Sequence, residues 1–213
     1  MRMHRILVLT TALAACFAAS VNIAHAGFMA SVGPGTSIPH NSLDGTAGRT
    51  NVDLSNPVLL QAGDYTATFF NYDAGLASDV QPFVASANGV HSYLVLAAGD
   101  VRNLAGASEN QTVAFGGSNT FTLGAATTVY AGITSSGLNP IPFDSLSPGT
   151  YTTDHDQSGS QVFVGQTLAS FNAPDNPRRY AFSISVVPEP SSIVLAVAGI
   201  AGLLLAAWRK RTG

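Results

Sequence analysis

The chain has 213 residues, of which 46% are hydrophobic and 10% charged, and its formal net charge at pH 7 is −3. A single cysteine excludes an intramolecular disulfide scaffold, and nine basic residues are too few and too scattered for a nucleic-acid-binding surface, which neutralises phosphates with clustered Lys and Arg. The length leaves room for one ordinary domain between two apolar terminal segments.

Residues 1–26 form a predicted export signal. Two arginines lie in the first five residues, and the apolar stretch 6–24 follows them. Ala24 and Ala26 fit the small-x-small pattern that signal peptidase recognises, so the mature chain is expected to begin at Gly27. The alternative is a lipoprotein box that ends in Cys16, with that cysteine lipidated. Against it, the apolar run continues beyond Cys16, where a lipoprotein usually becomes polar.

Residues 27–187 form the predicted exported domain. It contains four arginines, no lysine and eleven acidic residues, which gives a formal charge of −7. Nucleic acids and anionic membrane surfaces would repel such a domain. Cleavage after Ala26 would leave it without cysteine, so its core alone must stabilise it.

Large apolar side chains alternate with small or polar ones along several segments of the domain, a period of two that predicts β-strands. The clearest segment is 179–186. The others are 65–72, 80–85, 90–96, 111–115, 120–123 and 127–133, with 161–164 as a weaker one. Turn-forming residues separate these segments, and none of them has the spacing of an amphipathic helix. We therefore expect a mostly β domain, an antiparallel β-sandwich or jelly roll.

Two segments of the domain are predicted to lack strands. The first thirty mature residues are rich in Gly, Ser, Pro and Asn and should form an irregular entry. Residues 134–160 hold three prolines and should form a long surface excursion, where a functional site is most expected.

The sequence 154–159 begins like a calcium-binding loop. Asp154, Asp156 and Ser158 offer oxygen atoms at alternate positions, and Gly159 follows at the bend. The twelfth position, where an EF-hand requires a bidentate glutamate, is a glycine, so a calcium ion would need a further ligand such as Asp144. The alternative is a solvated acidic turn.

No catalytic residue or resident cofactor is predicted. His40, His91 and His155 are far apart in the sequence, whereas a zinc site needs a denser cluster, and His91 is expected as a half-buried residue of a strand. The domain has no nucleophile-elbow motif, no lysine and no cysteine, and its scattered carboxylates single out no glycosidase pair. We expect that it is not an enzyme.

The C-terminal segment predicts a membrane span. Every residue of 193–208 is apolar or glycine, and a helix of this length is about 24 Å long, which can cross a bilayer if flanking residues contribute. Arg209, Lys210 and Arg211 follow. By the positive-inside rule these residues stay in the cytoplasm and the domain faces outward.

Val187-Pro188-Glu189-Pro190-Ser191, with the apolar helix and the basic end, resembles the PEP-CTERM sorting signal of Gram-negative bacteria. The resemblance covers about the last 26 residues. It implies that 188–213 is a sorting tail, that its helix holds the chain in the inner membrane, and that an exosortase recognises Pro188, Glu189 and Pro190. Cleavage there would release the domain to the cell surface or the extracellular matrix. The alternative is a permanent single-pass anchor with a periplasmic domain.

Two non-enzymatic functions fit the exported domain. The first is a structural protein of the surface or matrix. The second is an adhesive module that binds exopolysaccharide, in one version with calcium, by stacking Tyr130, Phe143 and Tyr151 on sugar rings.

Overall fold

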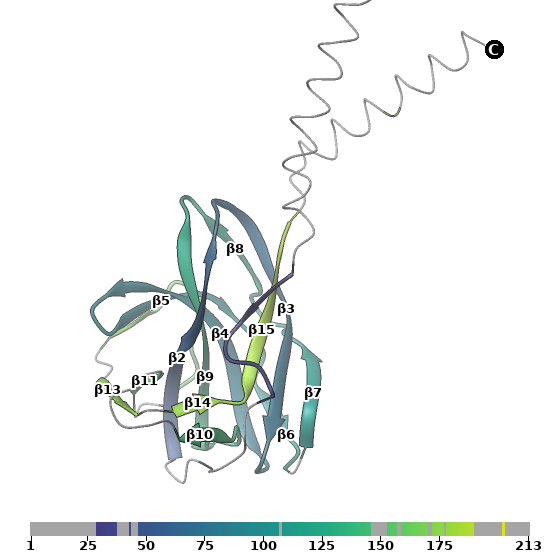
Figure 1. The fold of residues 1–213 in the computed structure, drawn as a ribbon, viewed down its shortest axis with the longest axis vertical. Helices are drawn as coiled ribbons and strands as arrows, with labels where there is room; N and C mark the ends of the chain where they lie inside the picture. The colour runs from purple at the N-terminus through teal and green to yellow at the C-terminus, as the bar shows by residue number, and fades with distance from the viewer. Residues whose placement is uncertain are drawn as a thin grey trace, which may run out of the picture. The chain divides into compact units, whose positions relative to one another are not determined.

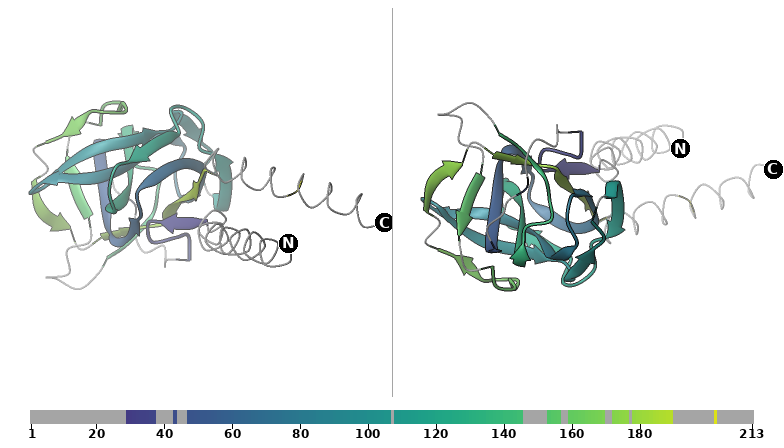
Figure 2. Two further views of the ribbon diagram at one scale, coloured as in Figure 1. Left: turned by 90° about the horizontal axis from the view of Figure 1, so that it is seen from above. Right: turned by 90° about the horizontal axis from the view of Figure 1, so that it is seen from below.

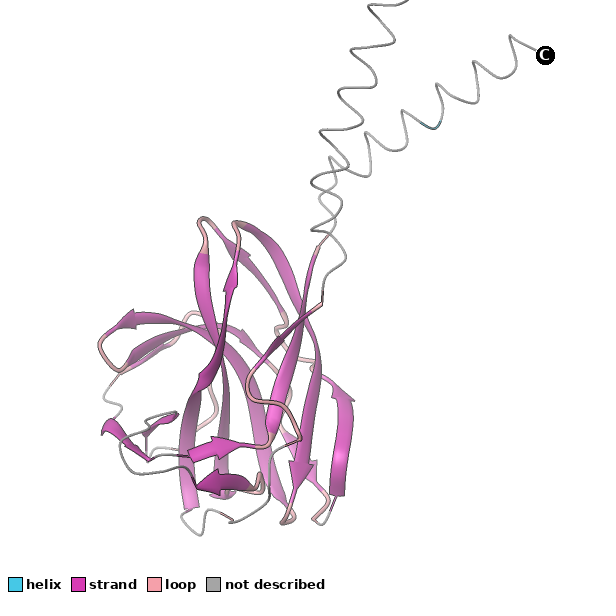
Figure 3. Ribbon diagram, in the orientation of Figure 1, coloured by secondary structure: helices cyan, strands magenta, loops and turns pink. Residues whose placement is uncertain are grey.

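The structure is a computed structural model that describes residues 29–37, 43, 47–106, 108–145, 153–156, 159–169, 172–176, 178–189 and 202. Within it, Met29–Val187 forms one compact unit. Strands dominate the described part of this unit, which contains no helix (Figure 3). All strand pairs recorded there are antiparallel. The prediction of a mostly antiparallel β domain is therefore confirmed.

One sheet has five strands (Figure 1). Its order is β1 (Ala30–Val32), β15 (Phe182–Pro188), β3 (Gly63–Ala74) and β7 (Ser108–Ala114), with β8 (Thr120–Leu123) also paired to β3. The chain enters and leaves this unit on neighbouring strands, because Ala30 pairs with Val186.

The other large sheet has eight strands. Its order is β12 (Thr167–Leu168), β5 (Ser92–Ala98), β4 (Ser78–Gly89), β9 (Thr127–Leu138), β2 (Ala47–Leu60), β11 (Thr153–Asp156) and β13 (Asn172–Asn176), with β6 (Arg102–Leu104) also paired to β4. A two-stranded sheet of β10 (Phe143–Ser145) and β14 (Arg178–Tyr180) lies beside β2 at one end of the unit (Figures 1 and 2).

The two large sheets share the main hydrophobic core. Val84 and Ile133 of the eight-stranded sheet belong to the same buried cluster as Phe70, Phe182 and Ile184 of the five-stranded sheet. A second cluster lies on the other face of the eight-stranded sheet, where Phe83, Tyr93 and Val95 pack with Val162 and Leu168. The segment 159–169 thus covers part of that face.

The longest strand of the unit, β2, was predicted as irregular entry, and this prediction was wrong. Between Asp53 and Val58 the register to β9 shifts by three residues, because Asp53 pairs with Ala131 and Val58 with Val129. Pro57 lies in this bulge, which suits a residue without a backbone N–H. The shift turns Val52 toward the second cluster and Val58 toward the main core.

Three further expectations need correction. Residues 134–160 are not one surface excursion, because β9 extends to Leu138, Ile141 is fully buried and β10 and β11 follow. The weak strand 161–164 is absent, although Val162 is buried there. The strand 179–186 is divided at Ala181 between β14 and β15.

Among the described residues, no helix is long and apolar enough to cross a membrane. The predicted membrane helix 193–208 lies outside the described residues, apart from Gly202.

Candidate functional site

A buried carboxylate joins β11 to the hairpin of β4 and β5. Asp154 is 1% exposed, and its Oδ2 accepts hydrogen bonds from Tyr93 Oη and lies 3.0 Å from His91 Nδ1. Its Oδ1 is buried and makes no hydrogen bond within the described part of the chain. Burial raises the pKa of the Tyr93 phenol, and the hydrogen bond to Asp154 raises it further, so Tyr93 remains a neutral donor.

His91 lies in the turn between β4 and β5, not on a strand as predicted. Its φ of 50° is left-handed, and its side chain is 33% exposed. Val90 and His91 form the turn itself, so the apparent alternation of 90–96 begins only at Ser92. The sequence did not indicate the contact between His91 Nδ1 and Asp154 Oδ2.

The structure describes the side chains of two of the predicted calcium ligands, Asp154 and Asp144. Asp154 is neither in a loop nor solvated, because β11 pairs with β2 and places it opposite Val52. Asp144 belongs to β10 and pairs with Arg179, with Oδ2 3.0 Å from Nη2. The side chain of Asp156 and the residue Ser158 lie outside the described residues. Nowhere in the described ranges do three His, Cys, Asp or Glu side chains come together as a metal-binding group. Calcium binding stays a prediction.

Asp53 is a second buried acidic residue, which was not predicted from the sequence. It follows Val52 on β2 and therefore points to the opposite face of that strand. Asp53 is 1% exposed, and its Oδ1 accepts hydrogen bonds from the backbone N–H and the hydroxyl of Ser55, at 2.8 and 2.5 Å. Burial raises the pKa of Asp53 from 3.8 to about 7, and these hydrogen bonds, the backbone of Tyr180 and the charge of Arg179 offset burial only in part.

Asn51 lies two residues before Asp53 and therefore on the same face of β2. It is 1% exposed, and both polar atoms of its amide lack hydrogen bonds to the described residues. The alternation of polar Arg49, Asn51 and Asp53 was the one signal in the sequence for this polar side of the strand. It was not recognised because a polar face turned inward is uncommon.

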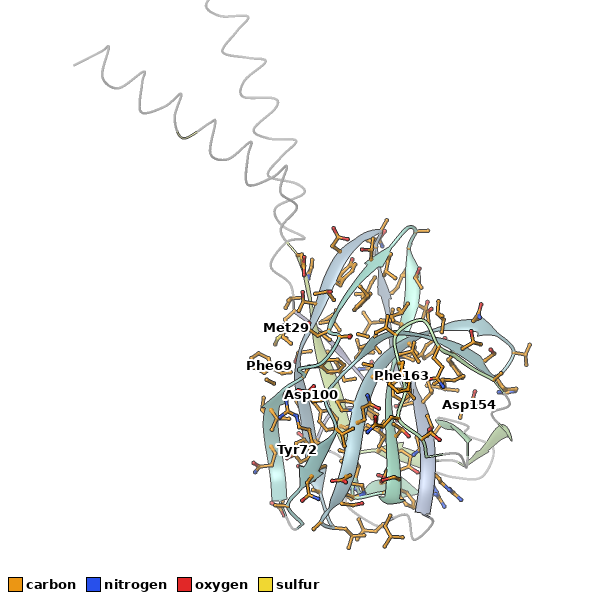
Figure 4. All side chains as sticks on the ribbon, turned by 180° about the vertical axis from the view of Figure 1, so that it is seen from behind. Met29, Phe69, Tyr72, Asp100, Asp154 and Phe163 are labelled. Atoms are coloured by element: carbon orange, nitrogen blue, oxygen red, sulfur yellow. The ribbon has the colours of Figure 1, made fainter. Side chains whose placement is uncertain are left out.

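The aromatic residues predicted to stack on sugars do not form an exposed platform. Phe143 is 5% exposed and packs against Tyr180, with the Arg178 guanidinium 4.4 Å from its ring centroid. Tyr130 is half-buried and meets Tyr93 edge to face. Tyr151 lies outside the described residues. The large exposed aromatic residues of the described part are Phe69 and Phe163 (Figure 4).

The end of β15 leads directly into the predicted sorting residues. Val186 is fully buried, Pro188 is the last residue of the strand, and Glu189 is exposed. Pro190 lies outside the described residues, as do the predicted signal-peptidase site at Ala24, Ala26 and Gly27 and the basic end at Arg209, Lys210 and Arg211.

A family model for the PEP-CTERM protein-sorting motif matches residues 186–211. These residues are a PEP-CTERM sorting motif. The match confirms the resemblance found in the sequence, and such a motif implies export, sorting to the cell surface and processing by an exosortase. It begins two residues before the end of β15, so the PEP-CTERM tail continues a strand of the folded domain.

No curated protein matches the chain. Among solved structures, the chain is similar to the cysteine protease and lectin-like domains of Cwp84, a surface layer associated protein of Clostridium difficile, at 10% sequence identity and a TM-score of 0.34. The similarity covers 67% of this chain and 32% of that one. A likeness this weak does not establish a common fold.

Proposed function

We propose that the protein is exported by its N-terminal signal, held in the inner membrane by its C-terminal helix, cut by an exosortase at Pro188-Glu189-Pro190 and released to the cell surface or the extracellular matrix. The observation that carries this proposal is the PEP-CTERM match over residues 186–211. In this proposal the released domain is a structural β-sandwich, and the common core of its two large sheets supports that architecture.

The end of β15 supports cleavage at the motif. A cut at or after Pro188 would leave the buried residues Ile184 and Val186 in place between β1 and β3. The exposed Glu189 lies next to this cleavage site, where a protease could recognise its carboxylate. Cleavage would therefore remove the tail without removing any side chain of the core.

The pairing of β1 with β15 supports export through one membrane. Met29 and Val187 are neighbours at the same end of the five-stranded sheet, because Ala30 pairs with Val186. The proposed signal peptide ends three residues before Met29, and the apolar tail begins six residues after Val187. The two terminal segments predicted from the sequence therefore join the domain at neighbouring strand ends.

We also propose that the domain has no catalytic function and needs no cofactor. Asp154 holds both His91 and Tyr93, and within the described part of the chain no serine or threonine hydroxyl donates to His91. These contacts connect β11 to the β4–β5 hairpin, which supports a structural function for them. The alternatives are a permanent single-pass membrane protein with a periplasmic domain, and a polysaccharide-binding or adhesive module that in one version depends on calcium.

The proposal is tested by expressing the full chain in a host with its exosortase and in one without it. The C-terminal peptide of the protein in the membrane, surface and medium fractions is read by mass spectrometry. We expect a mature end near Pro188–Pro190 only when the exosortase is present. A chain that keeps Arg209-Lys210-Arg211 in both hosts would support the permanent anchor and contradict the proposal.

A further inference from the structure

The outer face of the five-stranded sheet is the side of β3 and β15 that points away from the main core. On β15, Phe182 and Ile184 point into the core, so Ser183 and Ser185 lie on the outer side, where each is only 4% exposed. The corresponding face of the eight-stranded sheet carries the second hydrophobic cluster, which Val162 and Leu168 help to cover. The outer face of the five-stranded sheet is thus polar along β15, whereas that of the eight-stranded sheet is apolar and partly covered.

Phe69 is exposed on this outer face because β3 interrupts its alternation. Ala67 and Phe70 are both fully buried in the main core, so the two residues between them, Thr68 and Phe69, point outward. Phe69 is 45% exposed, and its partner on β7 is the exposed Ala114. A small neighbour leaves the phenyl ring accessible.

A row of uncharged hydrogen-bonding side chains adjoins Phe69. Asn71 donates to Ser185 Oγ at 3.2 Å and accepts a hydrogen bond from Thr112 Oγ1 at 2.9 Å. Thr68 Oγ1 donates to the carbonyl oxygen of Ser185 at 3.2 Å. These contacts fix the orientation of Asn71 and leave the exposed Thr112 hydroxyl free to accept from a ligand.

Charge is sparse along this face although the domain is acidic. At the start of β3, Asp64 accepts a hydrogen bond from Thr122 at 2.6 Å, and Asp73, near the other end, is 1% exposed. Between them the outward residues of the strand are Thr66, Thr68, Phe69 and Asn71. The cation nearest to Phe69 is Arg102, which donates to the carbonyl oxygen of Ala114 at 3.0 Å and is paired with Asp100 at 3.4 Å. The domain's net charge of −7 would therefore repel a polymer that carried negative charge.

We propose that this outer face binds a neutral polysaccharide, with Phe69 stacking on a sugar ring and with the Thr112 hydroxyl, which Asn71 orients, accepting a hydrogen bond from a sugar hydroxyl. Sugar rings offer an apolar face to an aromatic ring, and their hydroxyls both donate and accept, as the amide and hydroxyl groups beside Phe69 do. The inference rests on the proposed surface location, where such polymers occur, but it concerns a different part of the chain from the sorting motif.

The test measures retention of the processed protein, purified from the exosortase-containing host, on three neutral polymers, dextran, cellulose and mannan, and on the acidic polymer alginate. We expect binding to at least one neutral polymer and none to alginate. Phe69→Ala should weaken that binding by about tenfold, since an aromatic contact is worth roughly one factor of ten. Phe69→Trp should keep it.

Phe163→Ala is the matched control. Phe163 is 64% exposed on the loop before β12, away from the five-stranded sheet (Figure 4). This variant should bind like the original protein, and equal urea midpoints would show that all variants are folded. The inference is overturned if no neutral polymer binds, if Phe69→Ala binds normally, or if Phe163→Ala loses as much. A failure of sorting would instead appear in the C-terminal peptide.

Discussion

Removal of the Asp154 side chain should destabilise the domain. Replacing it with alanine deprives Tyr93 of its buried acceptor and His91 of its partner, so we expect the free energy of unfolding to fall by about 1–3 kcal/mol. Urea denaturation at pH 7 measures the change. Glu109→Ala, at an exposed position, should change stability by less than about 0.5 kcal/mol. Equal effects of the two substitutions would mean that the buried contact contributes nothing.

Asp53 should make the domain less stable as the pH rises. Its folded pKa, about 7, lies above the unfolded value of 3.8, so its favourable contribution is fully present below about pH 4. Between about pH 4 and 7 the unfolded chain ionises while the folded chain does not, and up to ~4 kcal/mol is lost.

The substitution Asp53→Asn should therefore flatten the pH dependence of stability and raise stability at pH 8 relative to the original protein. Urea midpoints at intervals from pH 4 to 8 measure this. Asp79→Asn, at an exposed site, should leave the slope unchanged. A steep slope that persists in Asp53→Asn would show that other groups cause it.

Strand β9 contains a glycine, Gly132, whose lack of a side chain leaves room for an aromatic ring of the neighbouring strand β4. Gly132 pairs with Phe83 of β4, and a Cβ on Gly132 would lie 2.2 Å from Cζ of the Phe83 ring. Gly132→Ala must displace a fully buried aromatic side chain, so we expect a loss of about 1–3 kcal/mol. Gly124→Ala serves as the control, because nothing lies within 4 Å of the added atom. Thermal denaturation of the two variants should separate them clearly.

Among the elements, periodicity identified the strands that have one apolar face. The segments 65–72, 80–85, 120–123 and 127–133 all lie within observed strands, and 111–115 extends one residue beyond the end of β7. The pattern did not predict β2 for two reasons. Asn51 and Asp53 are polar yet buried, and the bulge moves Val52 and Val58 onto opposite faces of the strand. An inward polar face and a shifted register both break the period of two on which the prediction depends.

The contact of Asp154 with Tyr93 could not have been predicted from the sequence. The two residues are 61 positions apart, on strands that β4, β9 and β2 separate in the sheet order, so neither their distance in the sequence nor strand pairing indicates the contact. The short sequence around Asp154 suggested a loop, since its alternating oxygen-bearing residues suit a cation as well as a strand. The sorting motif, in contrast, is one contiguous stretch of sequence, so its residues could be identified without any knowledge of the fold.

At the scale of the whole molecule, the boundary between domain and tail can be tested by truncation. A chain that ends at Glu189 retains all of β15, so we expect it to be secreted with the urea midpoint of the full chain. A chain that ends at Ala181 lacks the strand between β1 and β3 and should aggregate. Similar yields of the two would contradict the placement of the boundary.

The antiparallel pairing of β1 with β15 also determines how the domain would respond to mechanical force. Because Met29 and Val187 are adjacent, pulling them apart would open the hydrogen bonds between the two strands one after another, like a zipper, rather than shearing them together. A load that passed through both termini would thus separate β1 at low force. We therefore expect the domain to stay folded when it is attached at one terminus only, and to open when it is stretched between its two termini.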